Sequence, residues 1–167
     1  MIARYCRIDQ HFEQVAENFG PALMRLARSH EFDDELRAEL YQDIMLAIWQ
    51  ALPKLRDPER LRAYVFRIAH NCAARHVAQQ VNHRSLPLTD EPVESGHCPQ
   101  RHTEQQERHD RLMLAIQRLP LGRRAALTLF LEGLSHAEIA EVLDISENNV
   151  AVRINRARTQ LKEVMAS

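Results

Sequence analysis

Hydrophobic residues recur every three or four positions along most of this sequence, a spacing typical of helices with one buried face. The predicted helices cover residues 9–29, 34–51, 58–80, 104–119 and 122–131. Gly20-Pro21 is expected to kink or interrupt the first of them, because proline removes a backbone hydrogen bond. Asp57, just before Pro58, is a predicted N-cap of the third. Since strand-type alternation is rare, the predicted fold class is all-α.

The last third of the chain has a pattern typical of a helix-turn-helix. Gly133 is a predicted C-cap, and Ser135 with Glu138 forms a capping box that begins a short helix. A turn at Asp144-Ile145 leads to a second helix, which such motifs place in the major groove of DNA. A helical hairpin without a role in DNA binding is the alternative. The polar residues expected on the exposed faces of this second helix include Asn148, Asn149, Arg153, Asn155 and Arg156.

Residues 85–105 separate the two halves of the chain. This stretch holds three of the seven prolines, few large apolar residues and no helical period, which predicts an acidic, proline-containing linker. We therefore expect two small helical domains, residues 1–84 and 106–167, each near the lower size limit for an independent core. Their relative orientation is expected to vary or to be set by a partner.

The total charge conceals an uneven distribution. With 22 basic and 23 acidic side chains, the net charge of −1 by itself disfavours a polycation that coats nucleic acid. Residues 31–43, however, hold six acids and one arginine, whereas residues 60–84 hold five arginines and no acid. A domain with one acidic and one basic helix can meet two unlike partners, although two solvated helix faces would give the same pattern.

Composition also bears on location and chemistry. No apolar run approaches the roughly 18 residues of a membrane span, and the N-terminus lacks a signal-peptide pattern, so we expect a cytoplasmic protein without membrane insertion. The three cysteines indicate thiols rather than a disulfide framework. No phosphate loop or nucleophile–base pair is evident, so we expect no enzymatic activity and no cofactor. Two His/Cys groups, Cys72 with His76 and His97 with Cys98 and His102, lack zinc-motif spacing; we expect no metal, and a packed thiol at Cys72.

The segment from Leu119 to Lys162 resembles region 4 of bacterial sigma-70-type factors, and is most similar to the extracytoplasmic-function (ECF) group. The similarity lies in Glu-Gly-Leu-Ser-His-Ala-Glu-Ile-Ala-Glu-Val-Leu and in Asn-Val-Ala-Val-Arg-Ile-Asn-Arg-Ala-Arg. LuxR-type regulators carry a similar signature, but they need a receiver or ligand domain upstream. The strand-helix alternation that such a domain would show is not present in this sequence. The resemblance implies that the polar residues named above on the second helix read the −35 promoter element.

Two segments of the first half resemble sigma region 2. Glu39-Leu-Tyr-Gln-Asp-Ile-Met-Leu-Ala-Ile-Trp49 is similar to the helix that docks on core RNA polymerase, with Trp49 expected to be packed. Leu61-Arg-Ala-Tyr-Val-Phe-Arg-Ile-Ala-His-Asn71 is similar to the helix that opens and reads the −10 element. The implied polymerase-binding residues are Glu39, Leu40, Gln42 and Asp43. The implied −10 residues are Arg62, Arg67, Asn71 and Arg75; the aromatics beside them, Tyr64 and Phe66, are expected in the core.

The resemblance thus predicts a sigma factor that directs core RNA polymerase to promoters and helps to open the −10 element. An anti-sigma factor is the further partner it implies. Two departures from the family keep an alternative open: Ala151 stands where a Lys or Arg is usual, and residues 74–84 contain only two arginines. That alternative is a sigma-like decoy that binds an anti-sigma factor without initiating transcription.

Overall fold

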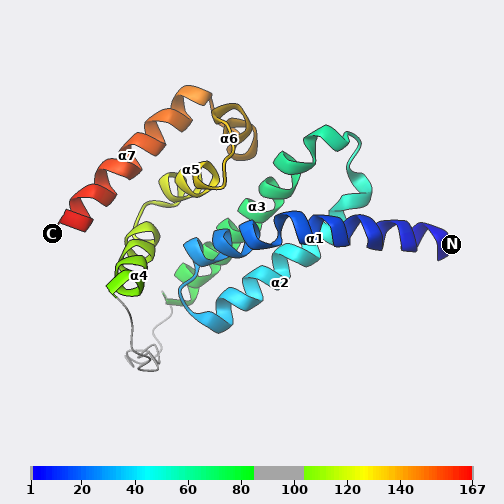
Figure 1. The fold of residues 1–167 in the computed structure, drawn as a ribbon, viewed down its shortest axis with the longest axis horizontal. Coiled ribbons are helices and arrows are strands. Elements are labelled where there is room, and N and C mark those ends of the chain that lie inside the picture. Colours follow the sequence, from blue (N-terminus) through cyan, green and yellow to red (C-terminus); the bar gives the residue numbers. More distant parts are fainter. Residues whose placement is uncertain (1, 85–103, 167) are drawn as a thin grey trace.

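The computed structural model describes residues 2–84 and 104–166, and every regular element within these ranges is a helix (Figure 1). The all-α prediction is therefore confirmed. The predicted linker lies almost entirely outside the described residues, as do His97, Cys98 and His102. The helices of the first half are α1 Ile2–His30, α2 Asp34–Ala51 and α3 Leu61–Arg84, with the 3-10 turns η1 Leu52–Lys54 and η2 Pro58–Arg60 between the last two. Those of the second half are α4 Glu104–Gln117, α5 Leu121–Leu131, α6 His136–Leu143 and α7 Glu147–Ala166.

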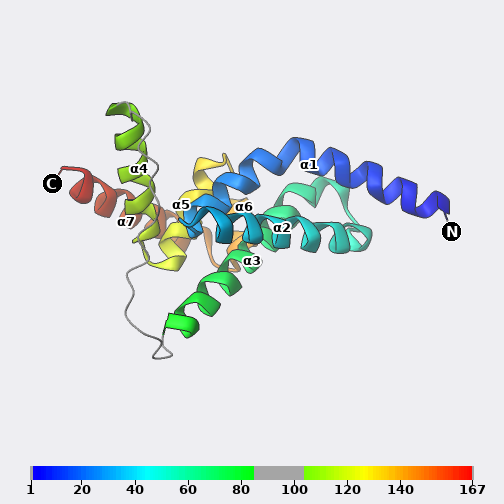
Figure 2. The ribbon, with the colours of Figure 1, turned by 90° about the horizontal axis from the view of Figure 1, so that it is seen from below.

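Helix α1 is longer than the sequence pattern predicts. It continues through Pro21 without interruption, although Figure 2 shows it change direction along its length. Pro21 lies on an exposed face, while Gly20 is buried with the Tyr41 hydroxyl 3.2 Å from the position of a β-carbon there. The tight packing against α2 at this point accounts for the glycine, and the helix accommodates the proline beside it.

Helices α1, α2 and α3 pack around an apolar centre. Leu40, Ile44 and Ile48, spaced four residues apart, form a fully buried stripe on α2. Phe66 of α3 is also buried, and its ring meets that of Phe19 edge-on at 6.2 Å between centroids. The interpretation of Phe66 as a core residue is thus confirmed.

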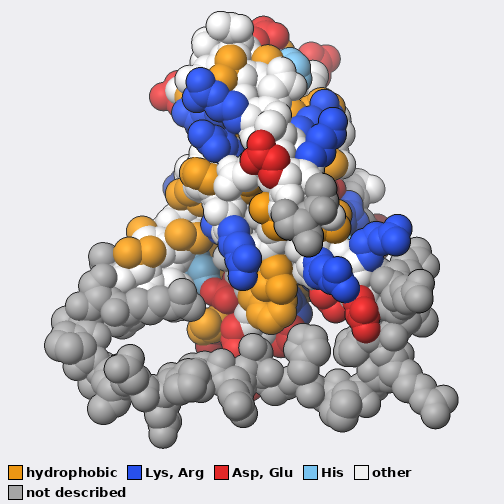
Figure 3. Space-filling view, turned by 90° about the vertical axis from the view of Figure 1, so that its left-hand side faces the viewer, with side chains coloured by type: hydrophobic (Ala, Val, Ile, Leu, Met, Phe, Trp, Pro, Cys, Tyr) orange, Lys and Arg blue, Asp and Glu red, His pale blue; other side chains and the backbone are white. Residues whose placement is uncertain are grey.

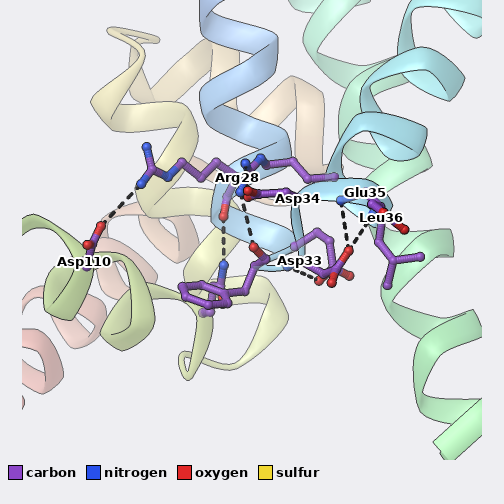
Figure 4. A network of polar contacts seen from close by, with 10 residues as sticks. Arg28, Asp33, Asp34, Glu35, Leu36 and Asp110 are labelled. Carbon is purple, nitrogen blue, oxygen red and sulfur yellow. Dashed lines mark hydrogen bonds and ion pairs between the residues drawn. The ribbon is translucent and has the colours of Figure 1, made fainter. Parts of the chain in front are cut away.

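Polar side chains fix where the helices of this half begin. The carboxylate of Asp33 accepts hydrogen bonds from the backbone N–H groups of Glu35 and Leu36, at 2.9 and 3.0 Å, and so caps α2 (Figure 4). Asp57 caps η2 in the same way through the N–H of Glu59, at 3.0 Å. Each cap satisfies donors that the first turn of a helix leaves unpaired.

The second half contains the predicted helix-turn-helix. Gly133 adopts a left-handed backbone (φ 79°) after α5, as the C-cap prediction requires. The capping box is present, with Ser135 accepting from the N–H of Glu138 and the Glu138 carboxylate accepting from the N–H of Ser135. Asp144, with φ 53°, makes the turn into α7. The helices α4, α5 and α6 all pack on α7.

The two halves of the chain also pack against each other. Helix α6 lies on α3, and α1 lies on α4 and α5, an arrangement that can be followed in Figures 1 and 2. Most of the buried hydrophobic residues of both halves belong to one continuous cluster. The chain therefore supplies from its own residues the contacts that set the orientation of the halves, where the sequence suggested a variable orientation or one set by a partner.

Candidate nucleic-acid and polymerase interfaces

Three of the four predicted −10 residues form one exposed row on α3. Arg67, Asn71 and Arg75 are spaced four positions apart, which places them above one another on one helix face, and all three are exposed. The guanidinium of Arg67 lies 5.8 Å from the centre of the Tyr64 ring, a cation–π distance. Tyr64 itself is half-buried, and its hydroxyl donates to the carbonyl oxygen of Ala51 at 3.1 Å. The row thus presents two cations and an amide to solvent on a firmly held helix.

Arg62, the fourth predicted −10 residue, does not join this row. It is half-buried, and its guanidinium donates to the carbonyl oxygen of Glu132, at 2.9 Å, in the second half of the chain. A second nitrogen lies 3.9 Å from the carboxylate of Glu138. In this structure Arg62 is therefore engaged by the other half of the molecule.

The predicted −35 residues lie on the outer faces of α7. Its inner face buries Val150, Ile154 and Ala157. The outer residues Asn148, Asn149, Asn155 and Arg156 are exposed.

Arg153, the remaining predicted −35 residue, is partly buried. Its Nε donates to the side-chain oxygen of Asn149 at 3.2 Å. A β-carbon at Gly122 would stand only 2.9 Å from Nη1 of Arg153, so this guanidinium lies against the start of α5. Burial lowers the pKa of His70 in α3, and the positive charge of Arg153 lowers it further. The contacts of Arg153 thus lie within the second half of the chain, while its charge acts on His70 of the first half.

The acidic face of α2 is the predicted polymerase-docking surface. Glu39, Gln42 and Asp43 are exposed there, as expected. The prediction for Leu40 was wrong, since Leu40 is 1% exposed and its side chain belongs to the core. Because the position lies one residue from Glu39 on a helix, it necessarily points elsewhere.

Two apolar residues that sequence reasoning did not select extend the same face of α2. Leu46 is 53% exposed and Trp49 is 36% exposed, so Trp49, which was expected to be packed, is packed only in part. They follow Asp43 at spacings of three residues, which continues the exposed stripe. The signal in the sequence was the three- and four-residue spacing from Glu39 onward, which places a leucine and a tryptophan on a polar face.

Comparison with known proteins covers both halves of the chain. A model of sigma-70 region 2 matches residues 15–82, and a model of sigma-70, region 4 matches residues 109–161. The RNA polymerase sigma factor NccH of Alcaligenes xylosoxydans xylosoxydans is 30% identical over 168 residues, which cover 95% of this chain and 89% of NccH. The chain belongs to the sigma-70 family of RNA polymerase sigma factors, in its ECF group.

Further relatives agree with this assignment. The ECF RNA polymerase sigma factor SigM of Mycobacterium tuberculosis is 28% identical over 156 residues, covering 92% of this chain and 76% of SigM. The structure of CnrH in complex with the cytosolic domain of CnrY matches with a TM-score of 0.70 and 26% identity, over 95% of this chain and 89% of that one. The sigma factor RpoE in complex with the anti-sigma factor NepR from Bartonella quintana shares the fold, with a TM-score of 0.75 at 21% identity over 94% and 98%.

A buried polar layer joins the region 2 module (α1–α3) to the region 4 module (α4–α7). The Thr128 hydroxyl of α5 donates to the Ser29 hydroxyl of α1 at 3.2 Å, and Ser29 donates in turn to the carbonyl oxygen of Leu26 at 2.7 Å. The Nδ1 atom of His30 lies 3.0 Å from both the Ser29 hydroxyl and the Leu26 carbonyl oxygen. All three polar side chains are buried. The contacts satisfy both hydroxyl groups and Nδ1 of His30, whereas the buried Nε2 of His30 has no hydrogen-bond partner among the described residues.

Ion pairs surround this layer. Arg25 of α1 binds the Glu132 carboxylate with two nitrogens, at 2.7 and 2.8 Å, and this hydrogen bonding raises the pKa of Arg25. Arg28 lies 3.5 Å from Asp110 of α4, as Figure 4 shows. Arg60 pairs with Glu141 of α6. Region 4 therefore sets three carboxylates against arginines of region 2 at this junction.

Cys72 and His76, which lie four residues apart on α3, have different surroundings in the structure. Cys72 is buried, as predicted, and burial raises the pKa of its thiol. His76 turns instead to the carboxylate of Glu31, at 2.8 Å. Among the described residues, no helix is long and apolar enough to span a membrane.

The side of the molecule formed by α4 and the end of α7 mixes charge with apolar surface. Figure 3 views this side and shows lysine and arginine side chains interspersed with hydrophobic ones. A shallow pocket here is lined by Arg111, Arg118, Leu114, Val164 and Met165, among others. The exposed hydrophobic residues on this side add a third surface, beside the α3 row and the α2 face, that is suited to contact with another protein.

Proposed function

We propose that this chain directs core RNA polymerase to promoters, that α3 captures the −10 element, and that α7 reads the −35 element. The observation that supports this most directly is the exposed row of Arg67, Asn71 and Arg75 on the region 2 helix. A cation row with an amide at its centre suits a strand whose bases have left the duplex.

The chemistry of the row suggests a division of labour. The guanidinium groups of Arg67 and Arg75 can bind phosphates of the displaced strand. Asn71 lies between them and can donate to and accept from one base edge, which a purely cationic surface cannot do. The ring of Tyr64, beside Arg67, offers partial stacking to an unpaired base.

Region 4 supplies double-strand recognition. The exposed asparagines of α7 carry amides that pair with adenine edges in the major groove, and Arg156 suits guanine or phosphate. Ala151 contributes no cation at the position where the family usually has one. We therefore propose that −35 binding is modest by itself and depends on polymerase holding region 4 near the DNA.

The α2 face supplies the polymerase contact. Its acids, Glu39 and Asp43, suit a basic partner surface, and the exposed Leu46 and Trp49 add apolar area that becomes buried on binding. Solved structures of CnrH and of RpoE contain CnrY and the anti-sigma factor NepR, respectively. By analogy we propose an anti-sigma factor as a partner of this chain, and the cytoplasm as its place of action.

Run-off transcription with purified core polymerase tests the proposal. The template is a promoter identified by sequencing transcripts after overexpression of this chain. We expect transcripts with the wild-type chain, loss of opening in Asn71→Ala, and weakened core binding in the double variant Glu39→Lys with Asp43→Lys. Glu17→Lys, on an exposed position of α1, is the matched charge control. Strong binding to an anti-sigma factor without any promoter opening would support the decoy instead.

A further inference from the structure

A pocket of about 230 Å³ lies where the end of α1, the later turns of α3 and the start of α5 meet. The side chains that line it include His30, Glu31, Phe32, His76, Val77 and Arg124. Two buried atoms of this lining, Nε2 of His30 and Nε of Arg124, have no hydrogen-bond partner among the described residues. Native proteins rarely leave such atoms unpaired, because burying them without a partner is costly. The promoter and polymerase surfaces proposed above do not include this pocket.

The contacts of His30 decide which kind of partner its Nε2 atom needs. Nδ1 lies 3.0 Å from both the Leu26 carbonyl oxygen and the Ser29 hydroxyl, and the hydroxyl already donates its own hydrogen to that carbonyl. Both neighbours of Nδ1 therefore accept, so Nδ1 carries the proton of the neutral ring. Burial lowers the pKa of His30 to about 4, which keeps the ring neutral at pH 7. Nε2 is thus left as an acceptor, and it needs a donor.

Arg124 has the opposite requirement. Both of its described hydrogen bonds use Nη2, which donates to the carbonyl oxygens of Gln117 and Leu119. Among the residues that the structure describes, no carboxylate forms an ion pair with this guanidinium, and burial lowers the pKa of Arg124. The charge of Arg124 also contributes to the lowered pKa of His30, so the two groups lie within electrostatic reach of each other. The pocket therefore contains a half-buried cation that needs an anionic acceptor.

The carboxylate that lines the pocket does not meet this need. Oε1 of Glu31 accepts from the backbone N–H of Asp33 at 3.0 Å, and Oε2 lies 2.8 Å from Nε2 of His76. Both oxygens of Glu31 are thus engaged by other groups. When the His76 ring is protonated, the charges of this pair cancel, and the guanidinium of Arg124 sets the charge of the pocket.

The size and the remaining lining of the pocket limit its ligand. A volume of about 230 Å³ is small beside the roughly 300–1,000 Å³ of sites for drug-sized molecules, which excludes a nucleotide. Phe32 and Val77 supply apolar surface that suits a short carbon chain. The ligand that fits is therefore small, and it offers anionic acceptors to Arg124 and a donor to His30.

We propose that this pocket binds a small oxyanion that carries a hydroxyl group, the class to which hydrogenphosphate and short 2-hydroxy acids belong. Its charged oxygens accept hydrogen bonds from Arg124, and its hydroxyl group donates to Nε2 of His30. A water molecule would satisfy a hydrogen bond but bring no counter-charge, and a simple carboxylate would bring the charge without the donor. The site lies outside the promoter and polymerase surfaces, so the proposal goes beyond the proposed function.

Lactate and propionate form a matched pair of probes, because they differ only in the hydroxyl group. The full-length free chain is titrated at pH 7 with each sodium salt at constant ionic strength, and binding is followed through the backbone amide signals of Phe32 and Val77. We expect saturable shifts with lactate and about tenfold weaker binding of propionate, since propionate leaves Nε2 of His30 unpaired. Inorganic phosphate is the second probe, and the tighter of phosphate and lactate identifies the source of the oxyanion. If neither saturates the signals, or if both act like sodium chloride, the pocket holds only water and the proposal is wrong.

Substitutions in the lining assign the two contacts. His30→Asn keeps a nitrogen near the position of Nδ1 but removes Nε2, so lactate and propionate should bind this variant about equally. Arg124→Gln removes the cation and should weaken lactate binding at least tenfold, since a charge-assisted hydrogen bond is lost. Arg124→Lys keeps the charge and should lose less, which covers the case in which Arg124→Gln fails to fold.

Arg123→Gln is the matched control for charge. Arg123 is the neighbour of Arg124 in α5, but it donates to Gln160 at 3.1 Å and is not part of the lining. This variant should bind lactate as the wild type does. If Arg123→Gln weakens binding as much as Arg124→Gln, or if His30→Asn still prefers lactate about tenfold, the assigned contacts are wrong. Because these titrations contain neither polymerase nor DNA, their outcome is independent of run-off transcription, and either proposal can fail without the other.

Discussion

Protonation of His30 should make the stability of this protein depend on pH. The ring is buried between α1 and region 4, and burial lowers its pKa from 6.5 to about 4. The nearby positive charge of Arg124 and the rings of His70 and His76 lower this pKa further, whereas the hydrogen bond to the Leu26 carbonyl opposes the shift. The unfolded chain therefore binds a proton at this site that the folded chain does not, throughout the window between pH 4 and 6.5.

The magnitude follows from linkage. Stability rises with pH wherever the unfolded state binds more protons, so acidification destabilises the fold. For a pKa of 6.5 in the unfolded state and about 4 in the folded state, the loss of unfolding free energy between pH 7 and pH 5 is about 2 kcal/mol. Below pH 4 this contribution levels off at about 3 kcal/mol, because both states are then protonated.

Urea unfolding at pH 7 and pH 5 measures this effect. His30→Asn removes the titrating ring, so its loss of stability between the two pH values should be about 2 kcal/mol smaller than that of the wild type. The cost of the substitution itself is present at both pH values and cancels in the comparison. His109→Asn makes the same replacement on an exposed face of α4 and should change with pH as the wild type does. Equal pH dependence in wild type and His30→Asn would refute the reasoning.

Three other substitutions test the local physics of the fold and site. Asp33→Ala removes the cap of α2 and should lower the unfolding free energy by about 1 kcal/mol in urea titrations, whereas Asp33→Asn should lose less. Gly133→Ala forces a β-carbon into a left-handed backbone and should cost about 1 kcal/mol, seen as a lower thermal midpoint. Arg156→Ala should weaken promoter binding by the holoenzyme and reduce the salt slope of log K by about 1, while a change confined to one sequence variant of the −35 element would instead indicate base contact.

The positions of most helices could be predicted from the sequence, because the residues that begin and end them act through short-range contacts. The bounds of α2 agree with the prediction residue for residue, since Asp33 and Leu52-Pro53 delimit it through short-range geometry. The capping box and the left-handed Gly133 are equally local. At Gly20-Pro21, by contrast, the helix continues, and Gly20 packs against the Tyr41 hydroxyl, a tertiary contact that no local rule contains.

The candidate surfaces were predicted less completely, for a related reason. Family resemblance assigns segments, but only the fold decides which residues of a segment face outward. Leu40 was therefore selected although it is buried, and Leu46 and Trp49 were missed although they are exposed. The diversion of Arg62 toward Glu132 depends on how two separate modules meet, which neither segment encodes by itself.

The hydroxyl pair of Ser29 and Thr128 limits how freely sigma modules of this kind can be exchanged. Each hydroxyl is buried and hydrogen-bonded to the hydroxyl on the other module, so the pair also restricts which modules can pack together. A region 4 grafted from a relative with a bulky or apolar residue at position 128 would leave Ser29 with one fewer partner at a packed junction. Chimeric sigma factors should therefore keep their promoter preferences. They should differ in how the two modules pack against each other in the free protein, unless both sides of this junction are exchanged together.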